Sequence, residues 1–143
     1  PNLKLQADPA RISAEMIEQV SGLLSRIRWD KDTVCDFLGH YLTEPKAHVF
    51  YDAPEEELDE DEFAEALASQ GLALDRKSQI LFCDDCVYCN GEKLAADAGD
   101  FAHWRQFANQ RKLAPGTFSA DMLASLYDGY LSGYWHLLTD VAQ

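Results

Sequence analysis

The chain has 143 residues, of which 47% are hydrophobic and 11% aromatic, with 12 basic and 25 acidic side chains. This composition is typical of a folded protein of one or two small domains and excludes a disordered chain. The length is sufficient to bury a hydrophobic core without disulfides. The formal net charge of -13 excludes a broad surface for nucleic acid or anionic membranes, because such surfaces need clustered Lys and Arg.

The N-terminal sequence and the lengths of the apolar runs bear on the cellular location of the protein. No apolar run approaches the ~20 residues needed to cross a bilayer, and the N-terminus lacks the basic and then apolar build of a secretory signal. We therefore expect a cytoplasmic protein. The chain starts at Pro1 without a methionine, as expected of a piece of a larger protein, although processing gives the same start.

Two helices are predicted within residues 1–51. Asp8 and Pro9 suit the N-cap and first position of a helix of about 15–20 residues. A second helix, with a stripe that begins at Val34, is stopped by Glu44-Pro45, because the residue before proline disfavours the helical conformation. Residues 48–51 are expected to be a short extended segment.

The first predicted helix carries an apolar stripe over about four turns, in a segment with little else to cover it. Such a stripe packs on a neighbouring domain or pairs with a copy of itself. The candidate contact surface is Ile12, Met16, Val20, Leu23, Leu24 and Ile27, and it is a dimer interface if the second alternative holds.

Most of the acidity lies in residues 52–71, which hold nine acidic and no basic side chains. We interpret residues 52–58 as an acidic linker. Asp59 and Glu62 have the spacing of a capping box for a helix that Gly71 ends. The acidic run is thus mainly a solvated linker and helix start, and a surface for a basic partner protein is the alternative.

A three-stranded meander is predicted over residues 79–95. Asp84-Asp85 and Asn90-Gly91 separate three short strands, and Asn-Gly is the strongest hairpin signal in a sequence. Two-residue turns place alternate residues on opposite faces of this sheet. The expected core face holds Ile80, Phe82, Val87, Cys89 and Leu94, and the other face holds Leu81, Cys83, Cys86, Tyr88 and Lys93.

Two more helices and a strand complete the predicted domain. Asp97 or Asp100 starts a helix that Pro115-Gly116 breaks, Ser119 starts the last helix, and a terminal strand follows over residues 134–138. The predicted fold class is α+β, with a helical dimerisation region at 1–51, the linker at 52–58 and a small winged-helix-like domain at 59–143.

The four cysteines are the most tempting chemical feature. Cys83 and Cys86 flank a turn on one face, whereas Cys89 points to the opposite face, so three thiolates cannot converge on a metal while the hairpin persists. We expect ordinary reduced cysteines, with Cys83 and Cys86 as a candidate redox pair. A cysteine-ligated metal or redox domain, including Cys35, is a further alternative.

No self-sufficient active site is visible in the sequence. None of His40, His48, His103 and His136 is followed two residues later by an acid, so no His-x-Asp/Glu iron motif is present. Zincin, phosphate-loop and hydrolase-elbow motifs are missing too. We therefore predict no catalytic, cofactor-binding or metal-ligating residue. The predicted helix 97–112 has too few basic side chains to read DNA.

Four segments together carry a family resemblance: LGHYLTEPKAHVF, DEDEFAEALASQG, DDCVYCNGEKL and LSGYWHLL. In this order and spacing they resemble the C-terminal part of the bacterial JmjC/cupin-type oxygenases that hydroxylate an arginine of a large-subunit ribosomal protein. The resemblance covers essentially the whole chain. The cysteine-rich hairpin departs from the family pattern.

The resemblance implies a parent enzyme with three parts. An N-terminal JmjC domain would bind Fe(II) and 2-oxoglutarate upstream of Pro1, a helical region would form the homodimer, and a winged helix would help present a basic ribosomal protein. This chain would match the second and third parts and would be non-catalytic alone. The runner-up is a free-standing acidic adaptor that binds a basic protein.

Overall fold

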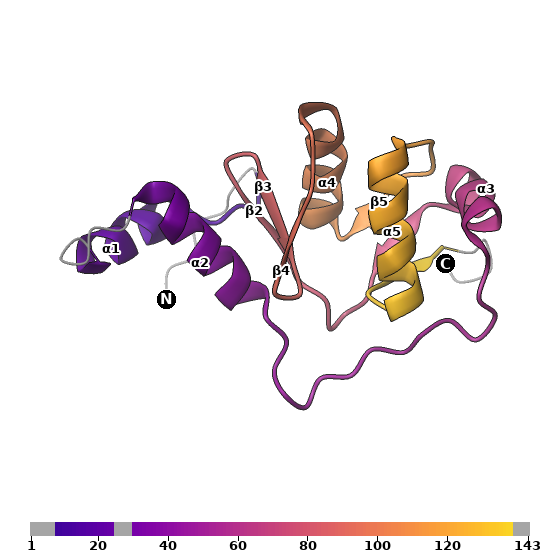
Figure 1. The fold of residues 1–143 in the computed structure, drawn as a ribbon, viewed down its shortest axis with the longest axis horizontal. Helices are drawn as coiled ribbons and strands as arrows, with labels where there is room; N and C mark the ends of the chain where they lie inside the picture. Colours follow the sequence, from indigo (N-terminus) through magenta and orange to yellow (C-terminus); the bar gives the residue numbers. More distant parts are fainter. Residues whose placement is uncertain (1–7, 25–29, 139–143) are drawn as a thin grey trace.

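The computed structural model describes residues 8–24 and 30–138, which fold into five helices and six short strands (Figure 1). The helices are α1 (Ala14–Leu24), α2 (Lys31–Thr43), α3 (Glu60–Gln70), α4 (Ala98–Gln110) and α5 (Ala120–Ser132). The strands are β1 (Leu72–Leu74), β2 (Ile80–Cys83), β3 (Cys86–Cys89), β4 (Glu92–Leu94), β5 (Lys112–Leu113) and β6 (Trp135–Leu137).

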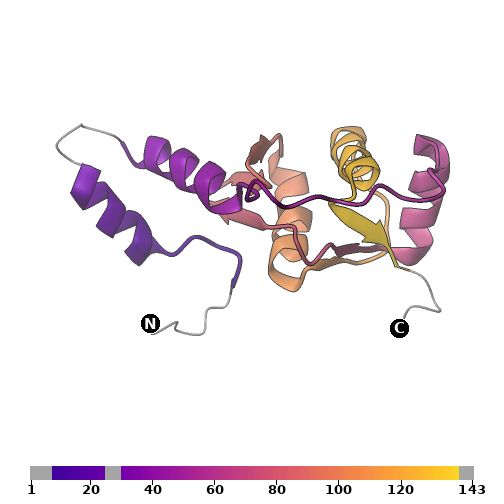
Figure 2. The ribbon, with the colours of Figure 1, turned by 90° about the horizontal axis from the view of Figure 1, so that it is seen from below.

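The strands form two small antiparallel sheets, in the orders β2-β3-β4 and β5-β1-β6. The predicted α+β class is confirmed by the five helices and the two small sheets. The molecule is elongated, with α1 at one end and α3 near the other (Figure 2). No helix within the described ranges is long and apolar enough to cross a membrane.

The meander has the predicted register, with Ile80 opposite Cys89, Phe82 opposite Val87, and Cys83 opposite Cys86. Its turns use left-handed backbone where the sequence supplies residues that tolerate it, at Asp84, Asn90 and Gly91. Since both turns hold two residues, the alternation of side chains is preserved across all three strands.

Both faces of the meander are buried, each in a different hydrophobic cluster. The predicted core face joins the main core, in which Trp104, Phe107, Leu126 and Trp135 are almost fully buried. The opposite face joins a second cluster built with the N-terminal helices: Ile12, Ile17, Val34, Cys35, Leu38, Cys83 and Tyr88. The hairpin therefore connects the main core to α1 and α2.

The expected start of the first helix at Asp8-Pro9 is wrong. Helix α1 begins at Ala14, and the Ser13 hydroxyl accepts a hydrogen bond from the amide of Met16. Asp8 instead forms an ion pair with Arg105 of α4, and Arg11 forms a parallel bridge with Phe82 of β2. The preceding residues are thus held by long-range partners rather than by the helix.

An extended segment, residues 44–58, runs from α2 past the sheets to α3 (Figure 1). Residues 48–51 lie within this extended segment, as expected, and pair with no strand. Tyr51 anchors the segment by donating its hydroxyl to the carbonyl of Lys77 at 3.1 Å and by an edge contact with Tyr134. The domain boundary at 52–58 stays a prediction.

Candidate functional site: an apolar helical surface, a cysteine junction and an acidic segment

Large apolar side chains are exposed only in the N-terminal part of the described chain. Leu23 and Tyr41 are the most exposed of the helical ones, at 81% and 64%. We name the five exposed residues of α1 and α2 the apolar helical surface: Met16, Leu23, Phe37, Tyr41 and Leu42. Phe50, in the extended segment, is also exposed. Among the described residues from α3 onward, by contrast, no large apolar side chain is exposed.

The predicted dimer interface only partly overlaps this surface. Met16 and Leu23 are exposed on α1, whereas Ile12 is buried before the helix, where its amide donates to the carbonyl of Phe82 at 3.1 Å. Val20 is half-buried against the second cluster. The side chain of Leu24 and all of Ile27 lie outside the described residues.

Sequence reasoning missed the contribution of α2 to this surface. Val34 and Leu38 point into the second cluster, while Phe37 and Tyr41, also one turn apart, stack on the outside with ring centroids 5.7 Å apart. The signal was present in the sequence, because the α2 stripe is too wide for a single buried face.

The junction of α2 with the hairpin is a polar cluster around Asp36. Tyr88 donates a short hydrogen bond to Asp36, and Lys93 forms an ion pair with the same carboxylate at 3.1 Å. The hydrogen bond from Tyr88 lowers the pKa of Asp36, whereas burial and then this carboxylate raise the pKa of Tyr88. His40 completes the junction through Nδ1 and the Gly91 carbonyl, at 2.8 Å.

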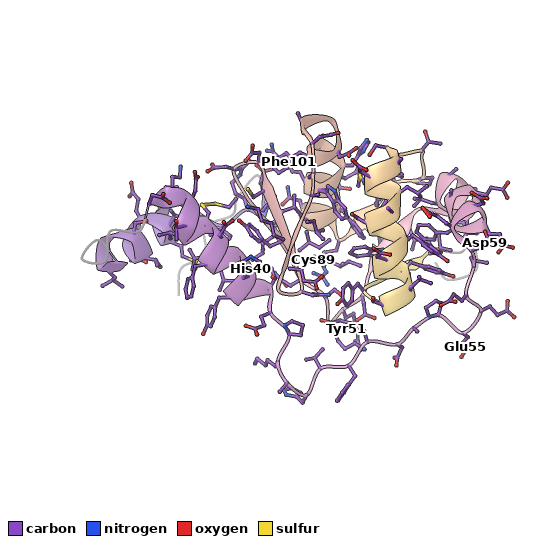
Figure 3. All side chains as sticks on the ribbon, viewed as in Figure 1. His40, Tyr51, Glu55, Asp59, Cys89 and Phe101 are labelled. Atoms are coloured by element: carbon purple, nitrogen blue, oxygen red, sulfur yellow. A yellow bond between two sulfur atoms is a disulfide. The ribbon has the colours of Figure 1, made fainter. Side chains whose placement is uncertain are left out.

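Three cysteines meet at this junction. Cys35 of α2 is joined by a disulfide to Cys83 of β2, with Cα atoms 6.1 Å apart, and the bond is visible between helix and hairpin in Figure 3. The structure therefore pairs Cys83 with Cys35 rather than with Cys86, because α2 packs directly on this face of the hairpin. Cys86 and Cys89 are free thiols.

The fourth cysteine is separated from the other three by the sheet. Cys89 lies on the main-core face, as predicted, and points away from α2 (Figure 3). Burial raises its pKa to about 12. Cys89 is therefore a core side chain with little nucleophilic character.

Within the described residues, one group of three side chains has metal-ligand spacing: Cys35, Cys83 and Asp84. Two of its members are bonded to each other, and no histidine takes part, so the group does not fit the two-histidine, one-carboxylate set of an Fe(II) oxygenase. His136 lies away from this group and contacts the carboxylate of Asp75 at 2.8 Å. The sequence did not reveal this contact.

The acidic segment, which we define as residues 52–65, exposes its acidic side chains, whereas Phe63 within it is buried. Asp59 and Glu62 form the predicted capping box, with bonds of 2.8 and 3.0 Å. All nine acidic side chains of the segment are exposed, and Glu55 and Asp59 point outward in Figure 3. Lys77, at 4.0 Å from Asp52, is the only ion-pair partner found for them within residues 8–24 and 30–138.

These features belong to a recognisable class of protein. Residues 26–136 match the family described as ROXA-like winged helix, and the chain belongs to that family. No curated protein matches the sequence.

Solved structures of Escherichia coli YcfD have the same fold. "X-Ray structure of E. coli ycfD" matches with a TM-score of 0.66 and 21% identity, over 96% of this chain and 38% of that one. "Structure of YcfD, a Ribosomal oxygenase from Escherichia coli" matches with a TM-score of 0.65 and 23% identity, over 96% and 39%. This chain thus spans about two fifths of the length of those proteins.

Proposed function

We propose that this chain is the dimerising and substrate-presenting part of a 2-oxoglutarate- and Fe(II)-dependent oxygenase that hydroxylates an arginine of a large-subunit ribosomal protein. Membership of the ROXA-like winged helix family and the fold shared with a ribosomal oxygenase support an oxygenase-related role. The described residues do not fit an iron site, so we assign the reacting groups to another domain of the same protein, in the cytoplasm.

The observation that carries the dimerisation proposal is the apolar helical surface. Monomeric proteins seldom leave large apolar side chains gathered on one part of the chain unless a partner covers them. Burying one such side chain fully stabilises a complex by roughly 1.5–3 kcal/mol. A two-fold interface counts each side chain twice, and the five are between 38% and 81% exposed in one copy. Their burial therefore stabilises the dimer by an amount of the same order as the association cost of about 4–15 kcal/mol.

Light scattering on the chain at tens of micromolar tests this proposal. We expect a mass twice the 16.1 kDa of one chain. The double variant Leu23→Ser, Tyr41→Ser should be a monomer with unchanged helical circular dichroism, because both side chains are exposed and contribute little to the fold of one copy.

Phe50→Ser is the matched control, since Phe50 is as exposed as Leu23 but lies outside the helices. It should leave the dimer intact. A wild-type monomer at this concentration contradicts the dimerisation proposal. If that monomer still binds a basic peptide, the result favours the alternative of a free-standing acidic adaptor.

The acidic segment supports the substrate-presenting part of the proposal. Ribosomal proteins that bind RNA are rich in Lys and Arg, and complementary charge steers such partners toward a surface. Asp52 pairs with Lys77, and Asp59 and Glu62 cap α3, but all the carboxylates of the segment are exposed to water and accessible to a basic partner.

A further inference from the structure

The covalent link between α2 and the hairpin has a third thiol beside it. Cys83, at the end of β2, is bonded to Cys35, and Cys86 is its cross-strand neighbour in the register of the hairpin. All three cysteines line one surface cavity of about 200 Å³. Cys86 is partly exposed there and carries no disulfide.

The geometry permits Cys83 to bond either neighbour. Disulfides form between residues whose Cα atoms are about 4.4–6.8 Å apart. The Cα atoms of Cys35 and Cys83 are 6.1 Å apart, and directly opposed residues of an antiparallel pair have Cα atoms about 4.5–5.5 Å apart. The two alternatives therefore share one sulfur, that of Cys83.

We propose that Cys35, Cys83 and Cys86 form a thiol–disulfide exchange site. The Cys86 thiolate attacks the sulfur of Cys83, a Cys83–Cys86 bond forms, and the Cys35–Cys83 bond breaks. The electron pair of the broken bond leaves with Cys35, which becomes a thiolate and takes up the proton lost by Cys86. No net oxidation occurs, and the exchange needs no other reactant.

The surroundings of Cys86 suit this role. Lys93, which pairs with Asp36, lines the same cavity as Cys86. The Cys86 thiol donates a hydrogen bond to the Asp85 carboxylate at 3.8 Å, so a proton acceptor lies beside the attacking sulfur. Cys89 is excluded from the exchange, since it is buried on the other face of the sheet.

The exchange makes or breaks the disulfide that joins α2 to the hairpin. In one form α2 is bonded to β2, and in the other the bond lies within the hairpin and α2 is held by noncovalent contacts alone. The disulfides that do occur in reducing compartments are usually transient, catalytic or redox-sensing bonds. The inference does not depend on the oligomeric state.

Peptide mapping distinguishes the two bonds. Trypsin places Cys35 in the peptide 32–46 and the other three cysteines in the peptide 78–93. The native chain is incubated with mixtures of reduced and oxidised glutathione, quenched in acid, and blocked with N-ethylmaleimide before digestion. We expect two products: the cross-linked pair of peptides, and the peptide 78–93 with an internal disulfide accompanied by 32–46 with maleimide on Cys35.

Matched variants assign the exchange to Cys86. Cys86→Ala should lose the internal disulfide and keep the cross-link, whereas Cys89→Ala should keep both products. The Cys35→Ala protein should form the Cys83–Cys86 disulfide when oxidised glutathione is added. Finding only the cross-link in every mixture overturns the proposal, as does a Cys35→Ala protein that forms only mixed disulfides with glutathione.

Discussion

The ionisation of Asp75, which follows β1, makes the stability of the β5-β1-β6 sheet depend on pH. It accepts hydrogen bonds from the amide of Lys77 at 2.9 Å and contacts His136 Nε2 at 2.8 Å. Burial alone would raise its pKa, but the bonds to His136 and Lys77 outweigh burial, and the pKa is lowered from 3.8. A lowered pKa in the folded state means that the ionised carboxylate adds stability above pH 3.8, and that this stability is lost as the pH falls through the folded value.

We therefore expect Asp75→Asn to reduce the free energy of unfolding by about 1–3 kcal/mol at pH 7. The difference from wild type should shrink well below pH 3.8, where wild-type Asp75 becomes protonated. Urea unfolding at both pH values measures this. Asp128→Asn, at an exposed position of α5, is the control and should change stability by less than about 0.5 kcal/mol. An equal loss at both pH values would argue against the carboxylate as the cause.

At the scale of elements, two helical glycines have opposite surroundings. A Cβ on Gly129 of α5 would overlap the indole of Trp135, which is buried, whereas a Cβ on Gly22 of α1 would meet no atom within 4 Å. Gly129→Ala should destabilise the protein by about 1–3 kcal/mol through overpacking. Gly22→Ala should stabilise it by about 0.5–1 kcal/mol, because alanine favours the helix.

Thermal unfolding of the two variants checks this contrast. Opposite shifts of Tm are expected. If Gly129→Ala were as stable as wild type, α5 would not pack on β6 as closely as the structure shows.

Elements set by local chemistry were predictable from the sequence. The meander follows from two turns, and the ends of α3 follow from the capping box at Asp59 and from Gly71. The start of α1 was not predictable, because Asp8 is an adequate N-cap whose competing partner, Arg105, lies 97 residues away. The Cys35–Cys83 bond escaped prediction for the same reason, since it spans 48 residues.

At the scale of the whole molecule, the concentration of negative charge in the acidic segment leads to a further prediction. The chain should bind an arginine-rich peptide, and the affinity should fall as salt rises toward ~0.15 M, where exposed charges are screened beyond about 8 Å. Fluorescence anisotropy measures the Kd. Glu55→Gln with Glu57→Gln should weaken binding severalfold, whereas Glu15→Gln with Glu18→Gln, the same charge change on exposed α1, should not. Equal weakening by both pairs would point to net charge rather than to the acidic segment.

The residues just before α1 pack against β2 and α4 rather than against α1. Arg11 and Ile12 lie along the outer edge of β2. Ala10 is part of the main core, and its amide donates a hydrogen bond to Oδ1 of Asn109 in α4 at 2.6 Å. A chain clipped by a protease at Ser13 would expose the backbone groups of that edge. An uncovered strand edge is a template for strands of other molecules. Proteolytic trimming at this point should therefore yield an aggregating product, although no residue of α3, α4 or α5 has been removed.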